Sequence, residues 1–168
     1  MRRSGPGSLL LALVLLTGCG PVRYGFVGGG LPSHIRTVAV LPFDNQTPSP
    51  DLQRELHERM RDELQARLGL REASEQRADA IVRGTILRYD TDVPIGFSAD
   101  PRQATSARRR LQLAVDVEIV DQTTGRTLWQ RRNLVADGDY DERAETQGRQ
   151  RAIEKLVADM IDGAQSQW

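Results

Sequence analysis

Residues able to bind a metal or catalyse a reaction are scarce, and the two histidines, His34 and His57, are the first to consider. His57 and Glu58 begin the H-E-x-x-H pattern, in which two histidines on one helix face bind zinc. Arg61 takes the place of the second histidine, and a guanidinium does not replace an imidazole as a zinc ligand. We therefore interpret His57 as a solvated side chain on a helix face.

A run of alternating aspartates begins like a calcium-binding loop: Asp137, Asp139 and Asp141. Such a loop requires glycine at its sixth position and glutamate at its twelfth, whereas this sequence has Glu142 and Gly148 there. The sequence also has no G-x-S-x-G pattern, no phosphate-binding glycine loop and no nucleophile paired with a base. It therefore predicts no catalytic residues, no metal site and no cofactor, and hence a protein that is not an enzyme.

The only cysteine, Cys19, lies in a setting that does indicate chemistry. Arg2 and Arg3 form a positively charged start, and an apolar segment runs from Leu9 to Leu16. Small residues follow, which completes the layout of a secretory signal peptide. The four residues Leu16-Thr17-Gly18-Cys19 resemble a bacterial lipobox. This resemblance implies that residues 1–18 are a lipoprotein signal peptide and that Cys19 is the lipidation site, with diacylglycerol on its sulfur and a further acyl chain such as palmitate on the new amine.

Composition limits the remaining classes. The chain has 168 residues, a length typical of one domain, and its 23 basic residues balance 23 acidic ones. A neutral chain of this kind is not expected to bind nucleic acid, which would call for a basic domain. The apolar segment before Cys19 is far shorter than the roughly 20 residues that cross a bilayer. We therefore expect contact with a membrane through the lipid anchor.

Residues 19–34 are rich in glycine and proline and are predicted to be a lipidated tether. Tyr24 and Phe26 are exceptions, because a free tether does not need aromatic side chains, and we expect them to pin the tether onto the domain. Residues 35–168 are expected to form that domain.

Apolar periodicity predicts the first elements of the domain. The nearly continuous apolar run in residues 36–43 indicates a central strand. From Asp51 the pattern becomes helical, and Gly69 is predicted to end that helix. One helix face carries an apolar residue at every fourth position: Leu52, Leu56, Met60, Leu64 and Leu68.

Three further strands are predicted over residues 78–89, 111–121 and 127–135. Gly84, in the middle of the first of them, is expected to mark a close approach by another element. The last two form a hairpin whose register the sequence leaves open. Either register places an arginine, Arg131 or Arg132, on the same face as Val115, so that face is not fully sealed or the last strand carries a bulge.

The final segment is predicted to be a helix, with residues 139–142 as its capping box. Its apolar residues recur every three or four positions: Ile153, Leu156, Val157, Met160, Ile161 and Ala164. The element order predicts an α+β fold in which two helices pack on one face of a four-stranded mixed sheet in a single domain.

A long loop is expected at residues 91–107, and arginines cluster in it and just beyond it: Arg102, Arg108, Arg109 and Arg110. Loops of this length are usually functional or disordered, and arginine forks suit phosphate or carboxylate groups. These four residues are our candidate contacts for a ligand or partner. The alternative is a solvated loop whose charges protect a strand edge from aggregation.

Several segments resemble the LptE family of lipopolysaccharide (LPS) assembly lipoproteins. They are residues 24–26, 31–32 and 35–47, where a strand ends in P-F-x-N-x-T before an amphipathic helix, and residues 78–86 and 121–129. The resemblance implies a two-helix, four-strand sandwich tethered to the periplasmic face of the outer membrane of a Gram-negative bacterium. It implies that the protein binds and plugs an LptD-like β-barrel, supports the barrel's assembly and LPS insertion, and has LPS as a candidate ligand.

Two alternatives remain open at this point. P-F-x-N and A-D-x-x-x-x-G phrases also occur in curli-secretion and penicillin-binding-protein-activator lipoproteins, so the chain could be an adaptor of another envelope machine. The second alternative is an envelope hydrolase with an unrecognised site. It would be supported if the soluble domain turned over a substrate and a single Asp or Glu substitution abolished this activity.

The anchor can be tested directly. Because acylation requires the Cys19 thiol, we expect Cys19→Ala to release the protein from membranes during a high-salt wash, as measured by fractionation and immunoblotting. A variant that stays with the membranes after the wash would contradict the anchoring prediction.

Overall fold

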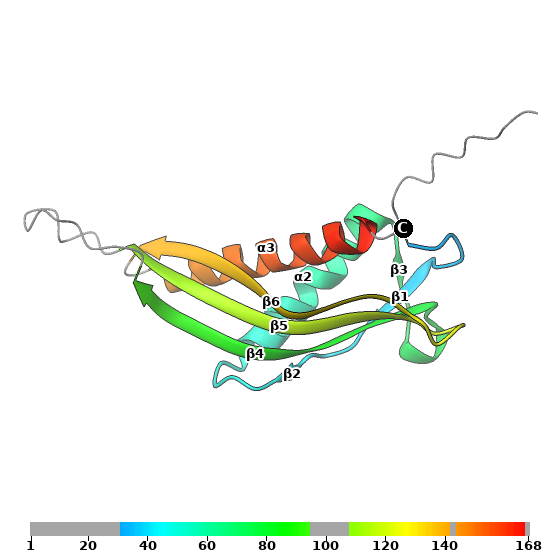
Figure 1. Ribbon diagram of the computed structural model, residues 1–168, viewed down its shortest axis with the longest axis horizontal. Coiled ribbons are helices and arrows are strands. Elements are labelled where there is room, and N and C mark those ends of the chain that lie inside the picture. Colours follow the sequence, from blue (N-terminus) through cyan, green and yellow to red (C-terminus); the bar gives the residue numbers. More distant parts are fainter. Residues whose placement is uncertain (1–30, 95–107, 142–143, 167–168) are drawn as a thin grey trace, which may run out of the picture.

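Three long neighbouring strands run the length of the molecule and carry its other elements (Figure 1). The computed structural model describes residues 31–94, 108–141 and 144–166. Along the chain, the described elements are β1 (Thr37–Val40), β2 (Asp44–Asn45), α2 (Asp51–Leu68), β3 (Arg71–Glu72), a 3-10 turn (Glu75–Arg77), β4 (Ala80–Pro94), β5 (Arg108–Asp121), β6 (Thr127–Asp141) and α3 (Glu145–Ser166).

The described strands form one mixed sheet. Its order is β3-β1-β4-β5-β6, and β2 pairs with β4 off this path. The short strands pair in parallel, whereas β4, β5 and β6 are antiparallel. The predicted α+β class is confirmed, with two helices on a mixed sheet in a single domain. The four predicted strands correspond to β1, β4, β5 and β6, and the structure adds the two-residue strands β2 and β3.

Each helix is held by one apolar stripe. Four side chains of α2 are at most 1% exposed: Leu52, Leu56, Met60 and Leu64. Burial of one such side chain stabilises the fold by roughly 1.5–3 kcal/mol relative to leaving it in water. Gly69 ends α2 as expected, in the left-handed conformation with φ of 65°. The expected apolar positions of α3 are also buried.

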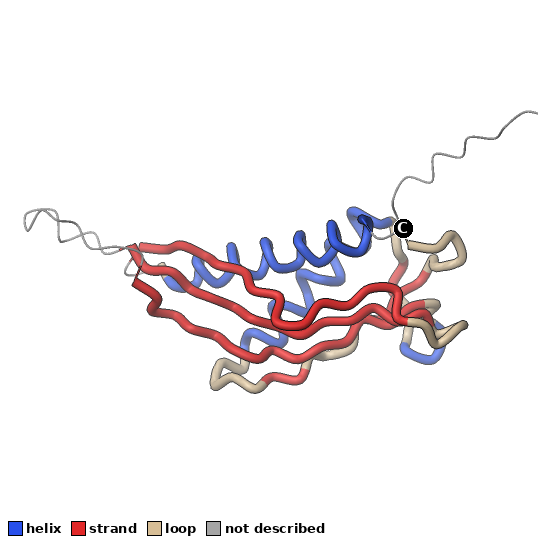
Figure 2. The backbone as a smooth tube through the Cα atoms, viewed as in Figure 1, coloured by secondary structure: helices blue, strands red, loops and turns tan. Residues whose placement is uncertain are grey.

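The helices lie on the same side of the sheet (Figure 1). α3 packs mainly over β6 and β5, while α2 lies beside α3 and against the short strands. An ion pair joins the two helices, with Arg149 Nε 2.9 Å from Glu55 Oε2. The other face of the sheet, called the outer face below, carries neither of the two α-helices (Figure 2).

Two bulges lie opposite the same part of β5. In β4, Leu87 has no partner between the pairs Ile86–Val115 and Arg88–Ala114. In β6, residues 132–133 together oppose Asp116. Such insertions bend a strand and increase its twist, and the long strands bend along their length in Figure 2.

The β6 bulge agrees with both readings of the hairpin that the sequence left open. The strand carries a bulge, and Arg131 pairs with Val117, so an exposed arginine also lies on the helix-facing side. Asn133 has φ of 48°, the single positive value for a non-glycine residue among the described residues. Asparagine adopts this region more readily than most residues. The Asn133 N–H donates to Asp116 Oδ1 at 2.7 Å, which fixes the bulge.

The close approach predicted at Gly84 is confirmed. A Cβ atom on Gly84 would lie 2.5 Å from the ring of Phe43 and 2.2 Å from the carbonyl oxygen of Asp116. Phe43 is 1% exposed and belongs to the hydrophobic core. The glycine therefore lets the chain after β1 place an aromatic ring directly on the sheet.

Several sequence predictions about element ends were wrong, since β5 begins at Arg108 rather than at residue 111 and β6 ends at Asp141 rather than at residue 135. The loop expected from Thr91 begins later, because β4 continues to Pro94, which pairs with Arg109. The helix expected to be capped at residues 139–142 begins at Glu145 instead. Asp139 belongs to β6, opposite Arg110. Opposite charges in facing positions stabilise a strand pair, so the aspartates extend the hairpin rather than cap the helix.

Gly84 gives a test of the packing. We expect Gly84→Ala to lower the free energy of unfolding by about 1–3 kcal/mol, the usual cost of overpacking a core. The control Thr85→Ala, on the opposite face of β4, should change it by less than about 0.5 kcal/mol. Urea unfolding of the purified protein followed by circular dichroism would measure both. Equal stability of the two variants would contradict the contact with Phe43.

Candidate functional site

The residues singled out in the sequence are only partly described. Cys19 and Arg102 lie outside the described residues. Arg108 is the first residue of β5, and its side chain is not described. Arg109 and Arg110 follow it in the strand, so only these two of the candidate contacts can be placed by their side chains.

Arg109 and Arg110 do not converge on one site. Successive residues of a strand point to opposite faces, and each guanidinium has its own carboxylate. Arg109 Nη1 lies 2.9 Å from Asp92 Oδ1, and Arg110 Nε lies 2.9 Å from Asp139 Oδ1. The hydrogen bond to Asp139, followed by the charge of the same group, raises the pKa of Arg110. An anion binding to either side chain has to compete with these acids.

The outer face is crossed by rows of polar side chains that satisfy one another. The cross-strand contacts are Arg83 to Glu118 at 2.6 Å, Arg88 to Gln112 at 3.3 Å, Gln112 to Asp137 at 3.1 Å, and Arg110 to Asp139 at 2.9 Å. Charged groups paired in this way remain solvated and cost little to expose. The face is therefore polar without being strongly basic or acidic.

Two apolar rows interrupt the polar ones. The strand pairing aligns Ala39, Ile81 and Val120 in the first row. It aligns Ala114 and Val135, beside the bulged Leu87, in the second. Ala39 and Ala114 are at most 4% exposed, yet none of these residues belongs to the hydrophobic core cluster.

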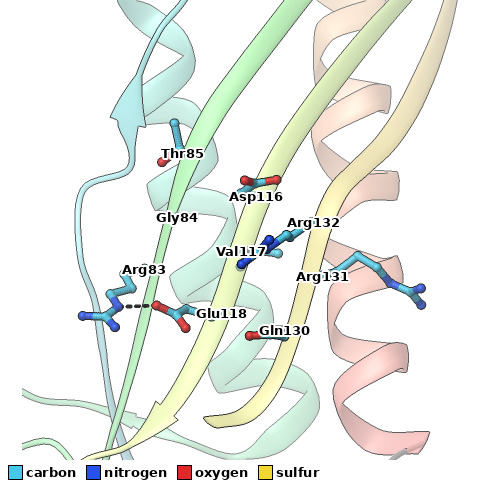
Figure 3. Close-up of a pocket in the computed structure, with 9 residues that line it drawn as sticks. All are labelled: Arg83, Gly84, Thr85, Asp116, Val117, Glu118, Gln130, Arg131 and Arg132. Atoms are coloured by element: carbon cyan, nitrogen blue, oxygen red, sulfur yellow. Dashed lines mark hydrogen bonds and ion pairs between the residues drawn. The ribbon is translucent and has the colours of Figure 1, made fainter.

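A groove lies on the outer face beside the β6 bulge (Figure 3). It has a volume of about 320 Å³ and is lined by Arg83, Gly84, Thr85, Asp116, Val117, Glu118, Gln130, Arg131 and Arg132. In Figure 3, Arg132 points across β5 between Asp116 and Glu118, whereas Arg131 points away from the groove. Of the described arginine side chains in β4, β5 and β6, those of Arg131 and Arg132 alone form no ion pair.

The groove offers groups that can bind a charged partner. The guanidinium groups of Arg83 and Arg132 stand with the carboxylates of Asp116 and Glu118 along an open surface. The sequence indicated an arginine or a bulge near Val115, but it did not indicate a groove. The walls of the groove come from β4, β5 and β6, and how these strands align depends on the two bulges.

Polar contacts fasten the start of the described chain to the β5–β6 turn. We call this end of the sheet the turn end; it comprises residues 31–37 and 121–127. His34 Nε2 lies 2.9 Å from Asp121 Oδ2, and the side chain of Asp121 is 2% exposed. The Asp121 carboxylate also accepts hydrogen bonds from Thr124 Oγ1 at 2.7 Å and from the Thr123 N–H at 2.8 Å.

These hydrogen bonds stabilise the charged form of the acids at the turn end. The Thr124 hydroxyl makes the largest contribution, helped by His34, and the pKa of Asp121 falls to about 2. Asp79 accepts the N–H groups of Arg36 and Thr37, and these bonds lower its pKa as well. Both aspartates therefore act as structural acceptors that order the beginning of the domain.

The described residues contain neither a metal-binding cluster nor a membrane-spanning helix. Within residues 31–94, 108–141 and 144–166, no group of three acidic, histidine or cysteine side chains is arranged to hold a metal ion. In the same ranges, neither helix is long and apolar enough to span a bilayer.

Comparisons with known proteins identify one family. The family model described as LptE, lipopolysaccharide-assembly, matches residues 35–164. No curated protein matches the sequence.

Solved structures share the fold at low sequence identity. The PelC dodecamer of Paraburkholderia phytofirmans is 16% identical with a TM-score of 0.51, covering 79% of this chain and 93% of that chain. A hypothetical protein of Chlamydia trachomatis is 14% identical with a TM-score of 0.51, covering 77% and 98%. A protein of Xanthomonas campestris is 7% identical with a TM-score of 0.52, covering 82% and 91%.

Asp121 predicts how stability depends on pH. Its pKa in the folded protein, about 2, lies below the unfolded value of about 3.9. The carboxylate therefore stabilises the fold above about pH 4, and this contribution disappears as the pH falls towards 2. We expect Asp121→Asn to lower the urea midpoint at pH 7, and the gap from wild type to narrow between pH 4 and 2. A gap that stays constant over this range would show that the charge of Asp121 does not matter.

Proposed function

Because this chain belongs to the LptE family of lipopolysaccharide-assembly proteins, we propose that it binds and plugs an LptD-like β-barrel in the outer membrane. In this role it supports assembly of the barrel and insertion of LPS. The family assignment makes the chain an outer-membrane lipoprotein of a non-enzymatic family. The observation that carries the proposal is the family match over residues 35–164, which includes both helices and the strands that form the sheet.

We propose that Cys19 holds the protein at the periplasmic face of the outer membrane. The support is the signal-peptide layout of residues 1–18 and the lipobox-like sequence that ends in Cys19. Only residues 20–30 separate this cysteine from the described chain, which begins at the turn end with Leu31. The turn end is therefore the end of the domain nearest to the lipid.

The outer face is the proposed contact with the barrel. The lumen of a large outer-membrane barrel is polar, and the outer face offers paired charges and amides together with a groove at Arg132. β4 and β6 each have 15 residues, so at about 3.3 Å per residue the strands span roughly 50 Å, comparable with the full thickness of a bilayer. The sheet is thus long enough to line such a lumen.

The end opposite the turn end is the proposed contact for anionic groups. There β5 begins at Arg108 beside Arg109 and Arg110, and the sequence places Arg102 shortly before it. Phosphate and carboxylate groups share the geometry that arginine forks recognise. LPS phosphates and acidic side chains of the partner are both candidate ligands, and they would have to displace Asp92 and Asp139 from their arginines.

Affinity purification of the intact lipoprotein from detergent extracts tests the proposal. We expect mass spectrometry to find an LptD-like barrel with the wild-type chain and much less of it with Arg132→Glu, because this change reverses the charge in the groove. Arg54→Glu, on the solvated face of α2, is the matched control and should recover the barrel normally.

Replacing Arg102, Arg108, Arg109 and Arg110 together by Gln should weaken binding of lipid A.

Other outcomes would redirect the assignment. Recovery of subunits of a secretion pore, or of a cell-wall synthase, in place of a barrel would favour the adaptor function. Equal recovery of the barrel with Arg132→Glu and with Arg54→Glu would remove the groove from the proposed interface.

A further inference from the structure

The free side of β6 is the longest open strand edge in the described part of the chain. β6 ends the sheet order β3-β1-β4-β5-β6, so no strand of the described residues pairs with it on the side away from β5 (Figure 1). β6 has 15 residues, whereas β3 at the other end of the order has 2. A long open edge is a template for pairing with another chain, so what lies along this edge matters.

The hydrogen bonds of β5 show which residues of β6 face the open edge. The Asp121 N–H donates towards the β6 side and the Gln122 N–H towards the β4 side, each at 2.9 Å. Because this direction alternates along an antiparallel strand, the odd-numbered residues of β5 bond to β6. Their partners within residues 134–141 are even-numbered. The odd-numbered residues from Val135 to Asp141 therefore turn their N–H and C=O groups towards the open edge.

A contact from α3 agrees with this orientation. Arg151 Nη1 donates to the carbonyl oxygen of Asp139 at 2.7 Å. The helix comes this close because β6 has a glycine beneath it, since a Cβ atom on Gly138 would lie 1.8 Å from the carbonyl oxygen of Gly148. α3 therefore borders the open edge as well as covering the sheet.

Two cavities lie where α3 borders β6. The first has a volume of about 330 Å³ and is lined by Asp139, Tyr140, Asp141, Gln147 and Arg151. The second, of about 490 Å³, has Asp137, Arg151 and Lys155 in its lining. Because both include Arg151, we treat them as one surface, called the edge groove below. It leaves room beside the part of β6 whose backbone groups point outwards.

Two basic side chains of α3 border the edge groove without a carboxylate partner among the described residues. Arg151 is exposed and contacts a backbone carbonyl, and Lys155 is exposed and forms no ion pair. The acids that line the same surface are already satisfied, because Glu63 and Glu154 lie 3.0 and 3.7 Å from Arg59. The helix side of the edge groove is therefore complementary to negative charge.

We propose that the edge groove binds an extended segment of a partner protein as an added strand beside Val135–Asp141, with acidic side chains facing Arg151 and Lys155. The segment's backbone bonds to the outward N–H and C=O groups of β6, as in β-augmentation. Alternate residues of a strand share one face, so every second side chain of the segment points towards α3. Arg151 then exchanges a carbonyl for a carboxylate, which forms a stronger hydrogen bond. This site is separate from the outer-face contact proposed above.

The charge of the edge groove disfavours a second copy of the chain as its occupant. Two copies that pair through β6 form a symmetric interface, in which each residue meets its counterpart region on the other copy. Both α3 helices then lie at the same interface. Arg151 and Lys155 of one copy approach the same two residues of the other, and like charges brought together in this way oppose association.

Binding of a synthetic peptide to the intact lipoprotein in detergent micelles tests the proposal. The probe is a capped eight-residue peptide in which glutamate alternates with threonine, and the matched control has arginine in place of glutamate. We expect the glutamate peptide to bind on the order of tenfold more tightly in fluorescence anisotropy, because it complements Arg151 and Lys155. Hydrogen exchange followed by NMR locates the peptide. The amides of Val135 and Asp137 should exchange faster than that of Ala136 in the free protein, and should slow when the peptide binds.

Variants of the protein separate the backbone from the charges. Val135→Pro removes an N–H that faces the open edge, and proline is tolerated at such a position of an edge strand. It should weaken binding of the glutamate peptide several-fold, whereas the matched control Val135→Thr keeps the N–H and should bind normally. Replacing Arg151 and Lys155 together by Glu should reverse the preference between the two peptides.

Equal affinity for the two peptides, or no binding of the glutamate peptide at millimolar concentration, would overturn the proposal and leave Arg151 as a cap that protects the edge. Equal binding by Val135→Pro and Val135→Thr would also overturn it, because the peptide would then not be an added strand. If Val135→Pro does not fold, methylation of alternate amide nitrogens of the peptide gives the same test. Dimers that form through β6 and exclude the peptide, detected by ultracentrifugation, would assign the edge to a second copy.

Discussion

The register of β5 between its two neighbours is the constraint on which the rest of the structure depends. β5 pairs with β4 and β6 along its length, and each neighbour carries a bulge opposite residues 114–116. On one side this register presents Val115, Val117 and Ile119 to the helices. On the other side it brings charges into cross-strand pairs and opens the groove at Arg132. The same strand pairing therefore positions both the core on one face of the sheet and the candidate surface on the other.

Much of this fold can be predicted from periodicity alone. The four-residue apolar spacing of α2 and the alternation in β5 each identify a buried face, because burial selects side chains locally. The ends of the strands cannot be predicted from periodicity in this way. Asp139 and Asp141 have the composition of a helix start, yet they face Arg110 and Arg108 across the hairpin. That pairing depends on two segments meeting in space, and a two-residue strand such as β3 has no periodicity at all.

The candidate site, too, could be predicted from the sequence only in part. Sequence reasoning identified the arginines at the start of β5, but the structure places Arg109 and Arg110 on opposite faces with separate carboxylates. The arginines without an ion pair on the long strands, Arg131 and Arg132, were noticed only as a difficulty of register. Their exposure follows from the bulge that Asn133 and Asp116 hold in place, which the sequence indicated only as one of two alternatives and without its position.

In the proposed function, this outer-membrane lipoprotein meets its partner through the polar outer face, with the turn end near the lipid and the arginine-bearing end farthest from it. Site-specific photo-crosslinking in living cells tests this most directly. A photoreactive residue at Thr85, on the outer face, should capture an LptD-like barrel much more efficiently than one at Glu58, on the exposed side of α2. Capture of the barrel from Glu58 but not from Thr85 would contradict the central claim.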